Sequence, residues 1–107
     1  MQTAILVIDP AGRIERVNAA AESTINMSAA TLKGRKLADV LALPSGFDAG
    51  SEAPFAAYDV DLITSRGVHL HGDFVVSPFP EWRGWRLVAI HGAAAAYRMG
   101  HRLERQG

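Results

Sequence analysis

The positions of hydrophobic and polar residues divide the chain into five strand-like segments and a helical middle part. Residues 4–9 (AILVID) and 85–92 (WRLVAIHG) are apolar almost without interruption, which is typical of strands buried on both faces. Residues 55–65 and 68–79 alternate instead, so each predicts a strand with one face on the core and one face in water. Residues 14–18 predict a fifth strand, which forms a hairpin with the first segment through the turn PAGR.

The alternation also predicts which side chains face the core. In residues 55–65 it places Tyr58, Val60 and Leu62 inward and Asp59 and Asp61 outward. In residues 68–79 it places one apolar set inward, Val68, Leu70, Phe74 and Val76, and one polar set outward, His69, His71 and Asp73.

Short helices are predicted between the second and third strands. Asn18 is a suitable N-cap for an alanine-rich helix over residues 19–27, because its side-chain oxygen can accept a hydrogen bond from a free amide of the first turn. Ser28 begins a second short helix, which Gly34 ends. Residues 37–43 predict a third helix with its leucines and valine on one face.

These elements predict an α+β fold. The first and last strands, apolar on both faces, are expected to lie side by side at the centre of the sheet. This gives a five-stranded antiparallel sheet with the strand order 2-1-5-4-3 and short helices on one face. Residues 93–106 predict a C-terminal helix, in which Ala96, Met99 and Leu103 form an a/d seam.

Composition limits the class of protein. A chain of 107 residues with 49% hydrophobic and 21% charged residues fits one globular domain. Acidic and basic residues number 11 each, and this balance argues against non-specific nucleic-acid binding. The absence of cysteine excludes disulfides, thiolate metal sites and thiol catalysis. No apolar stretch approaches the roughly 20 residues of a membrane span, and no signal peptide is apparent, so we expect a cytoplasmic location.

The first half of the chain resembles a PAS domain. A tight turn joins two strands, the motif N-x-A-A-E opens the first helix, and a glycine precedes an L-x-D helix. The residues that carry this motif are Asn18, Ala20, Ala21, Glu22, Gly34, Leu37 and Asp39. In the second half, the Y-x-V-x-L strand and the V-x-P-x-P strand end are similar to the sensor domain of NtrB-type nitrogen-regulation histidine kinases.

The resemblance implies a PAS domain over residues 1–92 and the start of a linker or signalling helix over residues 93–107. It implies a regulatory sensor or interaction domain of a two-component system, controlling kinase and phosphatase output through dimerisation and protein contacts. The implied partners are a second copy, a PII-type signalling protein and, in the full-length protein, a response regulator. The full-length protein is then a histidine kinase. This chain ends at Gly107 with neither an H-E-x-x-N-P motif nor a glycine-rich ATP motif, so alone it is not expected to phosphorylate anything.

An alternative is a PAS domain that binds a small metabolite between its helices and the inner sheet face. The candidate pocket residues are Leu37, Leu41, Phe47, Leu62, Leu70 and Phe74. Residues 44–54 are few and the inward side chains are large, so we expect no large cofactor. None of the four histidines lies between residues 18 and 68, where haem-binding PAS domains usually carry their ligand.

A further alternative is a small metal-binding protein or enzyme. His69, His71 and Asp73 share one strand face, and imidazole and carboxylate groups can bind zinc or another divalent ion. Neighbouring side chains on one strand project in parallel, however, and seldom converge on one ion. We therefore expect a polar, solvated face without metal. No nucleophile or phosphate-loop motif is present, and no catalytic residue is predicted.

Two central strands with apolar residues on both faces would expose a contiguous apolar patch, which soluble monomers seldom do. In the first strand the outward residues are either Ile5 and Val7 or Leu6 and Ile8, and in the last strand they are either Leu87 and Ala89 or Val88 and Ile90. The sequence leaves both choices open, because a shift of one residue exchanges the two sets of a strand. We expect a dimer through this face and through the Ala96, Met99 and Leu103 seam. In the competing arrangement, the terminal helix folds back over its own sheet and leaves a monomer.

Overall fold

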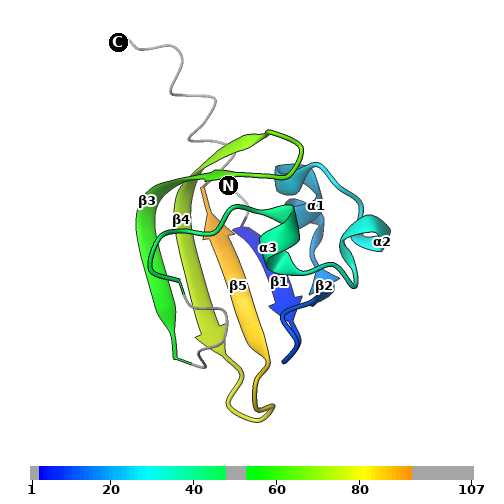
Figure 1. The fold of residues 1–107 in the computed structure, drawn as a ribbon, viewed down its shortest axis with the longest axis vertical. Coiled ribbons are helices and arrows are strands. Elements are labelled where there is room, and N and C mark those ends of the chain that lie inside the picture. The colour runs from blue at the N-terminus through cyan, green and yellow to red at the C-terminus, as the bar shows by residue number, and fades with distance from the viewer. Residues whose placement is uncertain (1–2, 48–52, 93–107) are drawn as a thin grey trace.

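A computed structural model describes residues 3–47 and 53–92, and it shows one antiparallel sheet with short helices on one face (Figure 1). The strand order is β2-β1-β5-β4-β3, as predicted. The predicted C-terminal helix lies outside the described residues. The elements are β1 (Thr3–Ile8), β2 (Ile14–Val17), α1 (Ala19–Ile25), α2 (Ala29–Leu32), α3 (Leu37–Val40), β3 (Phe55–Ile63), β4 (His69–Pro78) and β5 (Arg86–His91).

The two central strands, β1 and β5, bury alternate residues on the helical side of the sheet. Leu6 pairs with Val88, and both are buried, as are Ile8 and Ile90. The other set, Ile5, Val7, Leu87 and Ala89, is half-buried and lies on the opposite face of the same strands. The structure therefore resolves the choice that the sequence left open.

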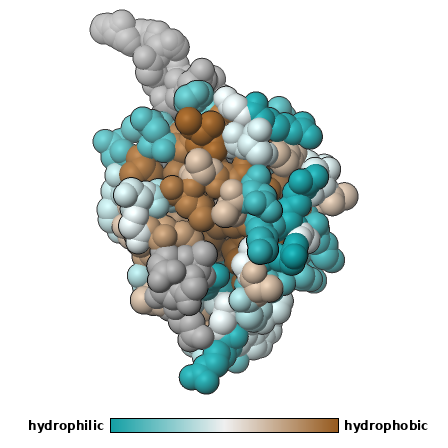
Figure 2. Space-filling view, viewed as in Figure 1, coloured by the Kyte–Doolittle hydropathy of each residue, from teal (hydrophilic) through white to brown (hydrophobic). Residues whose placement is uncertain are grey.

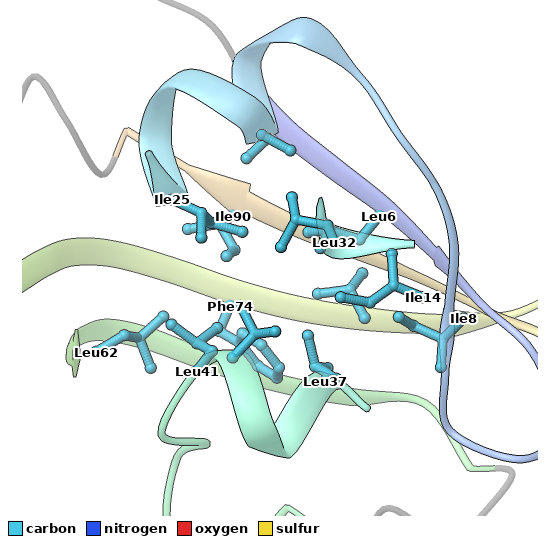
Figure 3. Close-up of a cluster of buried hydrophobic side chains, with 14 of the residues drawn as sticks. Leu6, Ile8, Ile14, Ile25, Leu32, Leu37, Leu41, Leu62, Phe74 and Ile90 are labelled. Atoms are coloured by element: carbon cyan, nitrogen blue, oxygen red, sulfur yellow. The ribbon is translucent and has the colours of Figure 1, made fainter. Parts of the chain in front are cut away.

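The hydrophobic core lies between the inner sheet face and the three helices (Figure 3). Each helix contributes to it: Ile25 from α1, Leu32 from α2 and Leu37 from α3. Phe74 of β4 is completely buried and is the largest side chain of the cluster. Burial of each such side chain contributes about 1.5–3 kcal/mol to folding, so these contacts hold the helices against the sheet.

Asn18 ties the first helix to the first strand. Its Oδ1 accepts hydrogen bonds from the backbone N–H of Ala21 in α1, at 2.9 Å, and of Ile5 in β1, at 3.0 Å. Its Nδ2 donates to the carbonyl of Thr3, at 2.9 Å. Glu22 in turn accepts from the N–H of Ala29 and connects α1 to α2. The polar residues of the N-x-A-A-E motif thus fix the entry to the helical layer.

The first and third helices are shorter than the pattern predicts. In α1, Asn26 adopts a left-handed conformation with φ 65° and donates its N–H to the carbonyl of Glu22, which ends the helix before residue 27. In α3, Leu41 is extended and forms a β-bridge with Thr64, and the N–H of Ala42 donates to the carbonyl of Ile63 at 2.8 Å. Backbone pairing with the end of β3 therefore replaces the last predicted helical turn.

The inward position predicted for Tyr58 is wrong. Ala57 pairs with Phe74 and Val60 pairs with Gly72, and the register shifts between these two pairs. Two residues, Tyr58 and Asp59, stand in the resulting bulge, where strict alternation fails. The Tyr58 side chain is 68% exposed, whereas Leu62 lies in the core and Val60 packs against it, as predicted.

Candidate functional site

The outer sheet face carries a contiguous set of half-buried apolar side chains, which we call the outer apolar patch. Ile5 of β1 pairs with Ala89 of β5, and Ala89 pairs with Val75 of β4. In the neighbouring row, Val7 pairs with Leu87. The described helices pack against the other face of the sheet, and their buried residues belong to the inner core. The patch is therefore a sheet face that no described helix covers.

Polar side chains occupy the β3–β4 end of the same outer face. The ring of His71 lies between two carboxylates of the neighbouring strand: Nε2 contacts Asp59, and Nδ1 lies 2.5 Å from Asp61. The bulge positions Asp59, whose φ is 56° and whose N–H donates to the Asp73 carboxylate at 2.9 Å. Outside this group, Thr3 Oγ1 lies 3.1 Å from Nδ1 of His91. These contacts give the apolar patch a polar border.

The two carboxylates raise the pKa of His71 above its ordinary value of 6.5. The largest cause is the hydrogen bond with Asp61, followed by the one with Asp59, and burial opposes both weakly. The imidazole side chain is 38% exposed, so solvent screens the pairing. The arrangement favours a protonated His71 between two acids.

The predicted polar set His69, His71 and Asp73 does face outward on β4. His71 turns to Asp59 and Asp61 of β3, Asp73 accepts the N–H of Asp59, and His69 is exposed. No three histidine, aspartate or glutamate side chains within residues 3–47 and 53–92 are grouped so that they could hold a metal ion. The described geometry is that of a hydrogen-bonded polar cluster.

On the helical side, a pocket of about 300 Å³ opens at one end of the core. It lies between the β1–β2 turn, helix α3, the segment around Phe47 and the adjoining ends of β4 and β5. Figure 2 shows apolar residues gathered in the middle of the molecular face that carries α3. The lining residues are Ile8, Pro10, Ala11, Gly12, Lys36, Leu37, Ala38, Leu43, Phe47, Val76, Arg86 and Val88.

Both charged residues of this lining are cations. Arg86 of β5 is only 6% exposed, and Lys36, immediately before α3, is exposed. No aspartate or glutamate stands among the described lining residues. The nearby Asp9 uses its carboxylate within its own turn, where it accepts from the N–H groups of Ala11 and Arg13, each at 2.9 Å. The pocket thus combines apolar walls with positive charge.

The predicted pocket residues separate into two groups. Leu37 and Phe47 line the pocket described above. Leu41, Leu62, Leu70 and Phe74 are buried in the core. The predicted set did not include Arg86, although its position two residues before Val88 and four before Ile90 on one strand indicates that it faces inward. The dimer candidates Ala96, Met99 and Leu103 lie outside the described residues.

Comparison with known proteins identifies the fold. A family model described as the PAS fold matches residues 1–95. The PAS domain of nitrogen regulation protein NR(II) from Vibrio parahaemolyticus is 23% identical and has a TM-score of 0.65, covering 82% of this chain and 86% of its own. The PAS domain of an HTR-like protein from Haloarcula marismortui is 18% identical with a TM-score of 0.58, covering 82% of this chain and 78% of its own.

A third similar structure is the Escherichia coli DhaR(N)–DhaL complex, with 19% identity and a TM-score of 0.59. The match covers 85% of this chain and 31% of that one, so it corresponds to one part of a longer protein. No curated protein sequence matches this chain. Within the described residues, no helix has the length and apolar character needed to cross a membrane.

Proposed function

Because the chain belongs to the PAS-fold family, we propose that it is the regulatory PAS domain of a cytoplasmic two-component histidine kinase of the nitrogen-regulation type. It acts by self-association through the outer apolar patch, and the packing of the two copies biases the balance between kinase and phosphatase output. A PII-type signalling protein and a response regulator are the further partners of the full-length protein.

The outer apolar patch is the observation that carries this proposal. Five half-buried apolar residues lie together on β1, β5 and β4: Ile5, Val7, Val75, Leu87 and Ala89. A contiguous apolar patch on a domain surface marks an interaction site more often than a solvated face. A central apolar area with a polar border is also the usual composition of a protein interface.

Charges at the border of the patch favour a second copy as the partner. Arg16, which pairs with Val7, is exposed at the β2 edge, whereas Asp59 and Asp61 are exposed at the β3 edge and towards the other end of the strands. Opposite charges thus stand at opposite corners of one face. In a dimer, the outer face of a second copy packs against the outer face of the first about a twofold axis. This places Arg16 of each copy near Asp59 and Asp61 of the other copy. Two sheets that pack face to face at an angle are a common arrangement.

The comparisons support this proposal at the level of the fold. The NR(II) domain is part of a nitrogen regulation protein, and DhaR(N) is seen in complex with another protein, DhaL. The first fits a role in nitrogen regulation, and the second fits a domain that works through protein contacts.

Sedimentation equilibrium at micromolar concentration tests the self-association. We expect the unaltered chain to be a dimer and Leu87→Glu to be a monomer, because the variant places a charge in the middle of the patch. Ala30→Glu is the control: Ala30 is exposed on α2, on the opposite side of the sheet, and this variant should stay dimeric. A monomeric parent protein, or a dimer that persists in Leu87→Glu, contradicts the proposal.

A charge reversal tests the arrangement of the copies. Arg16→Glu should weaken the dimer, and the double variant Arg16→Glu with Asp61→Arg should restore it. In the full-length protein, Leu87→Glu should change the ratio of autophosphorylation to phosphatase activity relative to Ala30→Glu. Equal ratios in the two variants contradict the regulatory role.

A further inference from the structure

We propose that the groove between β2 and α2 binds an extended acidic segment of a partner protein, which adds a strand to the free edge of β2. Helix α2 lies beside β2, at one edge of the sheet (Figure 1). This inference goes beyond self-association, because it assigns a second protein contact to a different part of the surface. It does not depend on the outer apolar patch.

The edge of β2 already pairs with one extended segment of the chain itself. Arg13, immediately before β2, forms an antiparallel β-bridge with Lys36. The N–H of Ile14 donates to the carbonyl of Arg35 at 2.8 Å, and the carbonyl of Ile14 accepts from the N–H of Gly34 at 2.8 Å. The segment from Gly34 to Lys36 thus covers only the first part of this edge.

The rest of the β2 edge is free. β2 is the last strand in the sheet order, and among the strands it pairs with β1 alone. Within the described residues, the main chain of Glu15, Arg16 and Val17 makes no hydrogen bond to any segment other than β1. Free main-chain groups at a sheet edge can pair with a strand of another chain, and these hydrogen bonds supply affinity whatever the side chains of that strand.

A groove of about 350 Å³ lies directly beside this free edge. Its apolar wall consists of Ile14 and Val17 from β2 and Ala29 from α2. The volume equals roughly twelve water molecules at about 30 Å³ each, which is space for one or two side chains of an added strand. Because side chains alternate between the two faces of a strand, every second side chain enters the groove, and the wall favours a small apolar residue there.

The charges around the groove make an acidic segment the complementary partner. Two cations, Arg16 and Lys33, line the groove, against one carboxylate, that of Glu15. Glu15 lies 3.9 Å from Lys33, and both side chains are exposed, so this ion pair is weak. A third cation, Arg35, donates from Nε to the carbonyl of Thr31 in α2 at 2.8 Å, which holds the guanidinium beside α2 without neutralising it. The positive charge therefore exceeds the negative charge here.

The opposite edge of the sheet is unsuited to the same segment. β3 is the other edge strand, and it carries a bulge together with the exposed carboxylates of Asp59 and Asp61. Bulges and charges hinder strand addition at an edge, and these two carboxylates repel an acidic segment. On the β2 side, the carboxylate of Glu22 accepts from the N–H of Ala29 at 2.9 Å. An acidic strand therefore selects β2 over β3.

Fluorescence anisotropy with labelled hexapeptides tests the ligand class. The first peptide is EVEVEV; KVKVKV reverses its charge, and EVEPEV keeps its charge but loses one N–H to proline, which hinders strand pairing. We expect EVEVEV to bind at submillimolar concentration and at least tenfold more tightly than the other two. Equal binding of EVEVEV and either counterpart, or no binding of EVEVEV at millimolar concentration, overturns the proposal. Tighter binding of a single-stranded oligo-dT overturns it in favour of nucleic acid.

Variants locate the site. Lys33→Glu should weaken EVEVEV binding at least tenfold, and Ala29→Trp should abolish it by filling the groove. Arg66→Glu is the matched control, because Arg66 is exposed in the β3–β4 turn and the change of charge is the same. Equal effects of Lys33→Glu and Arg66→Glu on EVEVEV binding overturn the assignment. Lys33→Glu should leave the sedimentation equilibrium of the chain unchanged, so this inference and the self-association are tested separately.

Amide chemical shifts in the unaltered chain give a second test of the location. EVEVEV should shift the amide resonances of residues 15–17 and of the neighbouring helix α2, and leave those of β3 unchanged. Shifts confined to β3 overturn the assignment, because they place the added strand at the opposite edge.

Discussion

Replacing Asn18 with alanine should destabilise the domain more than the loss of an ordinary helix cap. The side chain makes three hydrogen bonds at 2.9–3.0 Å: one to the first turn of α1 and two to the backbone of β1. Alanine removes all three at once and leaves the N–H groups of Ile5 and Ala21 and the carbonyl of Thr3 dependent on solvent. The strand and the helix also lose their connection.

The magnitude follows from these contacts. Loss of an asparagine cap costs typically about 1 kcal/mol, and each further hydrogen bond contributes about 0.5–1.5 kcal/mol. Because Asn18 is exposed, the lower part of that range applies to the two bonds with β1. The total is about 2–3 kcal/mol, which lowers the thermal midpoint of a domain of this size by roughly 10–15 °C.

Urea unfolding followed by circular dichroism measures this change. Ser28→Ala is the matched control, because Ser28 caps α2 by accepting from Thr31 N–H at 3.2 Å and its described side-chain hydrogen bonds stay within α2. We expect a loss of about 1 kcal/mol or less for Ser28→Ala. If Asn18→Ala costs no more than Ser28→Ala, the hydrogen bonds from Asn18 to β1 do not stabilise the domain. Asn18→Asp, which keeps the accepting oxygen but not the donor to Thr3, should lie between them.

Two further predictions concern His71 and two glycines. The proton resonances of the His71 imidazole should titrate with a midpoint above pH 6.5, and the Asp61→Asn variant should lower this midpoint. An unchanged midpoint in Asp61→Asn contradicts the pairing of His71 with Asp61. Because the folded-state pKa of His71 is raised, its stabilisation of the fold is complete below pH 6.5 and disappears as the pH rises through the folded-state pKa. Urea unfolding of His71→Gln should therefore differ from that of the parent protein mainly at acidic pH. Gly84→Ala should be more destabilising than Gly67→Ala by about 1 kcal/mol or more: both have positive φ, but only at Gly84 would the new Cβ meet Pro10, at 3.0 Å. Equal losses would show that this contact relaxes freely.

The sheet could be predicted from the sequence because the hydrophobic pattern of each strand is local and extends over several consecutive residues. Strands β1 and β5 are apolar at every position from Ala4 to Ile8 and from Leu87 to Ile90, a pattern that predicts the centre of a sheet, where both strands lie. The N-cap at Asn18 was equally predictable from the sequence, since a single side chain determines it. The outward direction of the Ile5 side chain could not be predicted, because it depends on which face of the sheet the helices cover.

Elements that depend on distant pairing were predicted less well. Tyr58 faces solvent because the register shift opposite Phe74 and Gly72 inserts an extra residue, and nothing in the local alternation marks that shift. Helix α3 stops early because Leu41 pairs with Thr64, the residue after β3, and Ala42 donates to the carbonyl of Ile63. The burial of Arg86 was missed for a different reason: residues 85–92 were interpreted as an apolar strand, and the arginine within them was given no role.

Disulfide cross-linking reports whether two copies meet through the outer apolar patch. The chain contains no cysteine, so a single introduced one reports a single position. Ala89 lies on the central strand β5 between Ile5 and Val75. Under mild oxidation, Ala89→Cys should form a covalent dimer rapidly and at low micromolar concentration, whereas Ala30→Cys, exposed on α2 on the opposite side of the sheet, should not. Equal and slow cross-linking of the two variants would show that the outer apolar patch does not join two copies.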